Sequence, residues 1–297
     1  MDWQSILLAS GYFFLFIAGS FALAFYWKRK RRTEIPFDKK LRLARQPGES
    51  QLELVRKGDE DDLFWIMLGG AAPAISLGVM LKGTAWFFGS MKIAWFVLSL
   101  AVFAVVLWFA MRMMAKRLQE RSDRYLGAFG ERFVGELLDP LKREKWHVFH
   151  DMPAEGKRRD FNLDHVVVGP TGVYVIETKT WRKEIGKGLP GATVIYDGRT
   201  LRGPRGVNNK PLDQVEANAK WLQEFLKAKL EVEVRPVLTF PEWGVKFDLS
   251  APDNRDTRVV ISSSLVKFLT TGQRPLSEQQ VDRIAEVIKE RCRTVEY

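Results

Sequence analysis

Three long runs without a charged residue, at 6–27, 63–81 and 93–111, dominate the first third of the chain. The first run has 22 residues, and a helix of that length is about 33 Å long. The other two are close to the roughly 20 residues that a helix needs to cross a bilayer. Buried core helices are the alternative for these two, but neither has a polar face for solvent. We therefore predict an α-helical membrane domain, residues 1–114, with three transmembrane helices.

Basic residues indicate how these helices are oriented. Five consecutive Lys and Arg residues, 28–32, directly follow the first run, which is typical of a stop-transfer anchor and not of a cleaved signal peptide. The loop 28–62 holds 11 Lys and Arg residues, against two in the loop between the second and third runs. Because basic loops face the cytoplasm, we predict a multi-pass cell-membrane protein with its N-terminus outside and its C-terminal domain cytoplasmic. No ionisable residue lies within the runs, which disfavours transport.

The remaining chain has the pattern of an α/β domain at 125–297, joined by a helical linker at 115–124. The order is helix, three strands, an insertion, helix, two strands and helix, which predicts a mixed central sheet flanked by helices. The single cysteine, Cys292, excludes internal disulfides and a cysteine-rich zinc site. The net charge of +10 is compatible with anionic lipid, nucleic acid or both. We expect strands at 146–149, 163–168, 173–177, 193–196, 235–240 and 258–261, and helices at 211–229, 265–269 and after Ser277.

A predicted hairpin gathers the residues with the clearest chemistry. The turn Gly169-Pro-Thr-Gly172 joins two strands, and pairing across it places Asp164 opposite Glu177. Two opposed carboxylates repel each other, and a divalent cation such as Mg²⁺ between them would remove that cost. Lys179 follows on the same face, about 7 Å along the strand, where its ammonium group can hold a water for attack on phosphorus. The alternative is a solvated charge cluster at a strand end.

Three segments together resemble the NERD (nuclease-related) domain of the PD-(D/E)xK nuclease superfamily. They are Gly-x-x-Gly-Glu131, then Asp164-His165-Val-Val-Val-Gly-Pro-x-Gly-Val-Tyr-Val-Ile-Glu177-Thr-Lys179, then Gln214-x-x-x-Asn218-Ala. The resemblance covers about residues 125–240 and implies a restriction-endonuclease-like fold. It also implies Mg²⁺ or Mn²⁺ at Asp164 and Glu177, an attacking water assisted by Lys179, and a contribution to the metal site by Glu131 from the first helix.

Other polar residues are assigned around this site. By the same resemblance Gln214 would touch DNA or order the site, and its alternatives are helix surface or a satisfied core amide. His165 alternates to the opposite face of its strand and is assigned a structural role. The glycine-rich insertion between Lys179 and Lys210 is strongly basic, which suits a mobile loop that contacts phosphates; a solvated face is the alternative. Its proposed nucleic-acid-binding residues are Lys183, Lys187, Arg199 and Arg202.

These features predict a membrane-anchored, Mg²⁺-dependent nuclease that hydrolyses nucleic-acid phosphodiester bonds on the cytoplasmic face, with DNA expected over RNA. The expected partners are nucleic acid and the lipid bilayer. The competing interpretation is a non-cleaving nucleic-acid-binding or scaffold module, anchored in the membrane as part of a DNA-transfer or defence assembly. The presence of Asp164, Glu177 and Lys179 together favours the enzyme.

Overall fold

A computed structural model describes residues 45–58, 92–156, 160–182, 193–203, 206–227, 230–248 and 255–292. All of them lie in one compact unit, Ala44–Val295. Two of the predicted membrane helices, 6–27 and 63–81, lie outside the described residues. The third, 93–111, falls in the helix α3, Lys92–Leu138. Among the residues that the structure describes, no helix is long and apolar enough to cross a membrane.

A five-stranded mixed sheet forms the centre of the domain, with the strand order β1-β2-β3-β7-β9. The first three strands are antiparallel, while β3, β7 and β9 run parallel to one another. This is the mixed α/β core expected from the sequence, and it fits a restriction-endonuclease-like fold. The strands are β1 (His147–Ala154), β2 (Phe161–Gly169), β3 (Gly172–Thr178), β7 (Val234–Phe240) and β9 (Arg258–Ile261).

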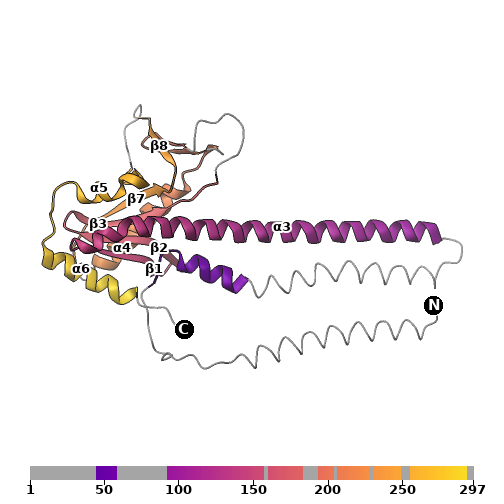
Figure 1. The fold of residues 1–297 in the computed structure, drawn as a ribbon, viewed down its shortest axis with the longest axis horizontal. Coiled ribbons are helices and arrows are strands. Elements are labelled where there is room, and N and C mark those ends of the chain that lie inside the picture. Colours follow the sequence, from indigo (N-terminus) through magenta and orange to yellow (C-terminus); the bar gives the residue numbers. More distant parts are fainter. Residues whose placement is uncertain are drawn as a thin grey trace, which may run out of the picture. The chain divides into compact units, whose positions relative to one another are not determined.

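Helices cover both faces of this sheet (Figure 1). Successive strand residues point to opposite faces, so Val166 and Val168 enter one core while Val167 enters the other. The first core is closed by α4, Lys210–Lys227, and α6, Glu278–Arg291. The second is closed by the C-terminal part of α3, by η1 (Asp139–Arg143) and by α5 (Leu265–Thr270). A further 3-10 turn, η2 (Ser262–Ser264), leads from β9 into α5.

The helix ends follow local sequence signals. Ser277 caps α6 with a full capping box, in which Gln280 bonds back to the cap. Pro211 lies in the first turn of α4, where its missing N–H costs no hydrogen bond. The long helix α3 ends at Leu138, two residues before Pro140, because proline disfavours a helical conformation for the preceding residue. The predicted linker 115–124 lies within this one continuous helix.

A second sheet, with the order β6-β5-β4-β8, is built largely from the insertion. Its strands are β4 (Thr193–Tyr196), β5 (Leu201–Gly203), β6 (Gly206–Val207) and β8 (Gly244–Phe247). The strand predicted at 193–196 is confirmed as β4, whereas the expectation of a loop is wrong for residues 201–203 and 206–207. Val194, Tyr196 and Leu201 extend the first core. Trp181 packs against Phe240 and Trp243, with ring centroids 4.9 and 6.0 Å away.

Candidate active site

The β2–β3 hairpin has the predicted register. Its Cα partners run from Gly169–Gly172 through Val168–Val173 to His165–Ile176. One position further along, the Asp164 Oδ2 atom accepts the backbone N–H of Thr178 at 2.7 Å. At this end of the hairpin, the acceptor is therefore the Asp164 side chain and not a backbone carbonyl. This bond holds the Asp164 carboxylate across from Glu177.

Glu177 is the most deeply buried acid of this cluster, with 1% of the residue exposed. The Lys179 Nζ atom donates to its Oε1 at 2.6 Å, and the Asn218 Nδ2 atom donates to its Oε2 at 2.9 Å. Burial raises the pKa of the Glu177 carboxyl, although Lys179 and Asn218 act to lower it. The two donors fix the carboxylate from opposite sides, one from the strand and one from α4.

Glu131 approaches the same cluster from α3. It lies three residues before the buried Val134 and is only 6% exposed, so the apolar side of the helix carries it inward. Burial, followed by the charges of Asp151 and Glu177, raises the pKa of Glu131 to about 8. The pKa of Asp164 is also raised well above its ordinary value, first by burial and then by Glu177 and Glu131. The three acids therefore sense one another's charge.

Lys179 is the cation of this group. Its backbone N–H donates to the Thr239 carbonyl at 3.0 Å, which continues the β3–β7 pairing. Burial acts to lower the pKa of its ammonium group, but Glu177, Asp164 and Glu131 together raise that pKa. Lys179 consequently stays protonated at neutral pH and is a hydrogen-bond donor there, not a base. Three carboxyl groups share this one ammonium group, which leaves the cluster short of positive charge once the acids ionise.

From the helix α4, Asn218 reaches the site and Gln214 does not. The sequence analysis did not assign Asn218 to the site. Gln214 is exposed, whereas Asn218 is buried with 4% exposure and bonds Glu177. A signal was present in the sequence, because Asn218 interrupts the apolar stripe of this helix between Val215 and Leu222. Buried polar side chains need a partner, and the partner here is a site carboxylate.

The proposed nucleic-acid-binding residues are only partly within the described chain. Lys183 and Lys187 lie outside it, while Arg199 and Arg202 are both exposed. Arg199 lies within a turn in which the Thr200 side chain and the backbone N–H groups of Thr200 and Arg199 lower the pKa of Asp197 to about 2. Arg202 lies on β5, where it pairs with Ile195 and Val207. These positions allow contact with a polyanion, and their role stays a prediction.

Two histidines behind the hairpin form a buried pair. The Nδ1 atoms of His150 and His165 lie 2.9 Å apart, which requires one ring to donate and the other to accept. Burial lowers the pKa of His150 to about 4 and that of His165 further below its ordinary value. Both rings are therefore neutral at pH 7, which is compatible with the structural role expected for His165. His147 points elsewhere and contacts Asp282.

The carboxylate cluster has the chemistry of a metal site but not the arrangement of one. Within the described ranges, no group of three or more His, Cys, Asp or Glu side chains is arranged to hold a metal ion. Both Glu177 oxygens and one Asp164 oxygen accept hydrogen bonds from protein donors in this structure. The chemistry of the donors nevertheless fits Mg²⁺ or Mn²⁺, because both ions prefer carboxylate oxygens. Binding would require the Lys179 ammonium to release Glu177.

Comparisons with known proteins agree with this part of the chain. Residues 126–241 match the family model of the nuclease-related domain, NERD. An uncharacterized protein of Bacillus anthracis is 26% identical over 81 residues, which are 27% of this chain and 38% of that relative. No solved structure matches the chain significantly. The matched range contains all four members of the carboxylate and lysine cluster, together with Asn218. The comparison thus supports a nuclease-related domain at residues 126–241.

Proposed function

We propose that this protein is a metal-dependent nuclease that hydrolyses phosphodiester bonds of nucleic acid, with DNA as its substrate. The observation that carries the proposal is the cluster of Glu131, Asp164 and Glu177 around Lys179, inside a nuclease-related domain. Buried acids with raised pKa values are costly for a fold and gather at functional sites. Nothing in the packing of the hairpin requires three of them.

The cluster lacks the positive charge that a divalent cation would supply. Asp164 and Glu177 would hold the ion, with Glu131 completing the site from α3. When bound, Mg²⁺ or Mn²⁺ would stabilise charge on the phosphoryl oxygens and lower the pKa of a bound water. The same charge would lower the raised pKa values of the acids, so that metal binding and their ionisation would favour each other.

The side chains themselves have separate tasks. The protonated Lys179 would donate to the attacking water and orient its oxygen toward phosphorus. The new bond forms from this oxygen to phosphorus while the bond from phosphorus to the leaving ester oxygen breaks, and the proton lost by the water passes to solvent. Asn218 keeps the Glu177 Oε2 atom in place while the Oε1 atom changes partner. Positioning of this kind lowers the barrier by holding the reacting atoms in a geometry suited to attack.

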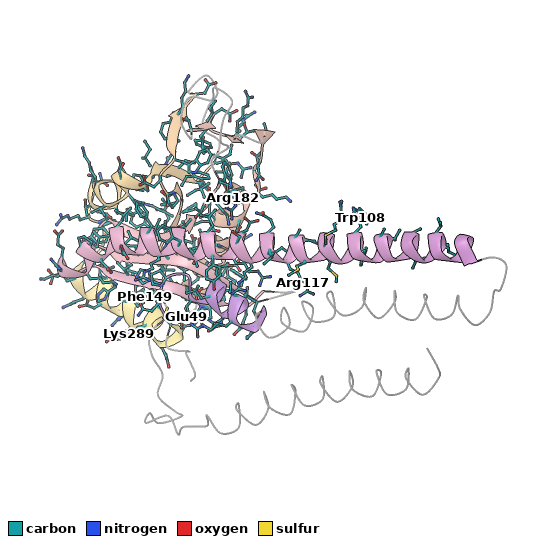
Figure 2. The ribbon with its side chains drawn as sticks, turned by 45° about the vertical axis from the view of Figure 1, so that its right-hand side comes forward. Glu49, Trp108, Arg117, Phe149, Arg182 and Lys289 are labelled. Atoms are coloured by element: carbon teal, nitrogen blue, oxygen red, sulfur yellow. The ribbon has the colours of Figure 1, made fainter. Side chains whose placement is uncertain are left out.

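We also propose that the domain is held at the cytoplasmic face of the cell membrane. The support is the three apolar runs, the basic loop 28–62 and the exposed apolar side chains on the N-terminal half of α3. Trp108 is one of them (Figure 2) and is followed by Arg112, whose guanidinium group lies 5.4 Å from its ring. Aromatic and basic residues together are typical of a membrane interface. The exposed group is Val97, Leu98, Val105, Trp108, Phe109 and Met111.

A second function has one observation in its favour. The Lys179–Glu177 ion pair and the Asn218 bond occupy both oxygens of the central acid. A domain that binds nucleic acid without cutting it would keep this closed arrangement permanently. Such a module would act as a membrane-anchored scaffold in a DNA-transfer or defence assembly.

Cleavage and metal-induced stabilisation by the full chain distinguish the two functions. Purified protein in detergent is incubated with DNA and RNA substrates and with Mg²⁺, Mn²⁺ or EDTA, beside the variants Asp164→Asn and Lys179→Ala. We expect metal-dependent cleavage by the wild type only. Metal should raise the Tm of the wild type and of Lys179→Ala, but much less that of Asp164→Asn, because only the last loses a ligand. Metal-independent binding without cleavage would instead support the scaffold.

A further inference from the structure

A segment far outside the matched domain reaches the site. Residues 45–58 precede residue 126 by about 70 positions, yet they pack against α3 and β1. Residues 49–58 form a helix whose first residue, Glu49, is labelled in Figure 2. The Leu54 carbonyl of this helix accepts from the Arg124 guanidinium at 3.4 Å. The same segment lies in the loop 28–62 between the first two predicted membrane helices.

The turn at residues 47–48, directly before this helix, packs closely against α3. Gly48 has a φ of 74° and lies so close that an added Cβ would be 2.8 Å from the Ala128 backbone. An added Cβ on Gly135 would be 2.5 Å from the Pro47 ring. Ala128, Glu131 and Gly135 share one face of the helix, at i, i+3 and i+7. Because Ala128 and Gly135 are small, the turn packs closely against α3 on both sides of Glu131.

The turn contacts Glu131 itself. The backbone N–H of Gly48 faces the Glu131 carboxyl group and acts to lower its raised pKa. Because Gly48 has no side chain, only its backbone acts on Glu131. A carboxylate that interacts with one N–H keeps further lone pairs for other partners.

A buried ion pair anchors the turn. The Arg45 guanidinium binds Asp151, with its Nε atom 2.6 Å from Oδ2. The Ser50 backbone N–H donates to the same oxygen at 3.1 Å, and Asn162 Nδ2 donates to Oδ1 at 3.0 Å. Asp151 is 1% exposed and has the left-handed φ of 49°. All of these donors reach the Asp151 carboxylate, so this acid holds the segment in place.

We infer that residues 45–50 are a working part of the nuclease site and position the Glu131 carboxylate for metal binding. The inference rests on the proposed function. Arg45 and Gly48 are then positioning residues, and the site depends on chain that lies between the first two apolar runs. A blocking role is disfavoured because Gly48 acts on Glu131 through its backbone N–H and has no side chain.

The test uses the full chain and three variants. Arg45→Ala removes the anchor and Arg45→Lys keeps its charge. Arg56→Ala alters an exposed residue of the helix 49–58. Loss of groups that orient ligands costs about 10- to 100-fold in metal affinity or activity. We expect Arg45→Ala to need that much more Mg²⁺ for half-maximal cleavage, with an unchanged KM for DNA, and to show a smaller metal-induced rise in Tm. Arg45→Lys should recover part of both, and Arg56→Ala should match the wild type.

A crosslink separates positioning from blocking. An ideal Cβ at residue 135 would lie 3.1 Å from the Pro47 Cβ, which is shorter than the roughly 3.5–4.5 Å of a disulfide. Because Pro47→Cys also removes the proline ring that faces residue 135, Pro47→Cys with Gly135→Cys should form a bond after a small shift of the turn. The native Cys292 is buried and its pKa is raised to about 12, which keeps it unreactive. We expect the oxidised protein to cleave as well as the reduced one.

Each result bears on one proposal. Cleavage lost on oxidation and restored on reduction would show that the segment must leave, and would overturn the inference. Failure of the two cysteines to bond in folded protein would overturn the docking. If the wild type cleaves and binds metal while Arg45→Ala behaves identically, only this inference fails. If the wild type neither cleaves nor is stabilised by metal, the proposed function fails, and the inference falls with it.

Discussion

Glu131→Gln is the substitution whose effect can be worked out most fully from the structure. The side chain keeps its size and its oxygen acceptor for the Gly48 N–H, but it cannot ionise. Burial, Asp151 and Glu177 raise the pKa of Glu131 from 4.5 to about 8. An acid whose pKa is raised by folding stabilises the fold most below its unfolded pKa. That contribution is lost as the pH rises through the folded pKa.

The size of the loss follows from the two pKa values. At pH 5 the protonated carboxyl contributes about 4 kcal/mol, and at pH 8 it contributes well under about 1 kcal/mol. The metal-free wild type should therefore lose on the order of 3 to 4 kcal/mol of stability over this interval through Glu131 alone. This is an upper bound, because Asp164 and Glu177 titrate together with Glu131. Glu131→Gln should flatten the pH dependence by up to that amount.

Urea unfolding of the full chain in EDTA, at pH 5, 6.5 and 8, measures this difference. The quantity of interest is the free energy of unfolding of the variant minus that of the wild type at each pH, since titrating groups that do not interact with Glu131 cancel in it. Glu136→Gln serves as the control, because Glu136 is an exposed acid on the same helix, paired with Arg132. Parallel curves for Glu131→Gln and the wild type would refute the assignment of a raised pKa to Glu131.

Three other outcomes are expected. Asn218→Ala should reduce cleavage about 10- to 100-fold by freeing the Glu177 carboxylate, whereas Gln214→Ala should have a smaller effect; equal losses in a cleavage assay would contradict the geometry. A reporter fused after Tyr297 should be active only as a cytoplasmic fusion, and activity outside the cytoplasm would reverse the topology. Neutralising four basic residues together should lower the salt slope of DNA binding by up to about 3.6, and an unchanged slope would exclude them as phosphate contacts. Those four are Lys183, Lys187, Arg199 and Arg202.

The hairpin was predictable because its determinants are local. The Gly169-Pro-Thr-Gly172 turn sets the register, and the register alone places Asp164 across from the end of β3. Helix boundaries were predictable for the same reason, as the Ser277 cap and the Pro211 start show. Turns and caps of this kind depend on a few adjacent residues. The family resemblance rests in part on the same hairpin residues.

Contacts between distant segments were not predictable in this way. The family resemblance pointed to Gln214, and the helix pattern orders residues around an axis without showing that Asn218 is the one that meets Glu177. The strand β8 was missed, since its four residues join the insertion only through pairing with β4.

By itself, the sequence determined the α/β order, the turn and the acid–lysine hairpin, because each depends on neighbours within a few residues. Only the tertiary structure decided which groups surround that hairpin. Glu131 arrives from α3, Asn218 from α4, and Gly48 from a segment that precedes the matched domain. The physical reason is that these contacts depend on packing across the sheet, and the positions of α3 and of the Arg45–Asp151 anchor follow from burial of apolar and paired charged groups that no local pattern specifies.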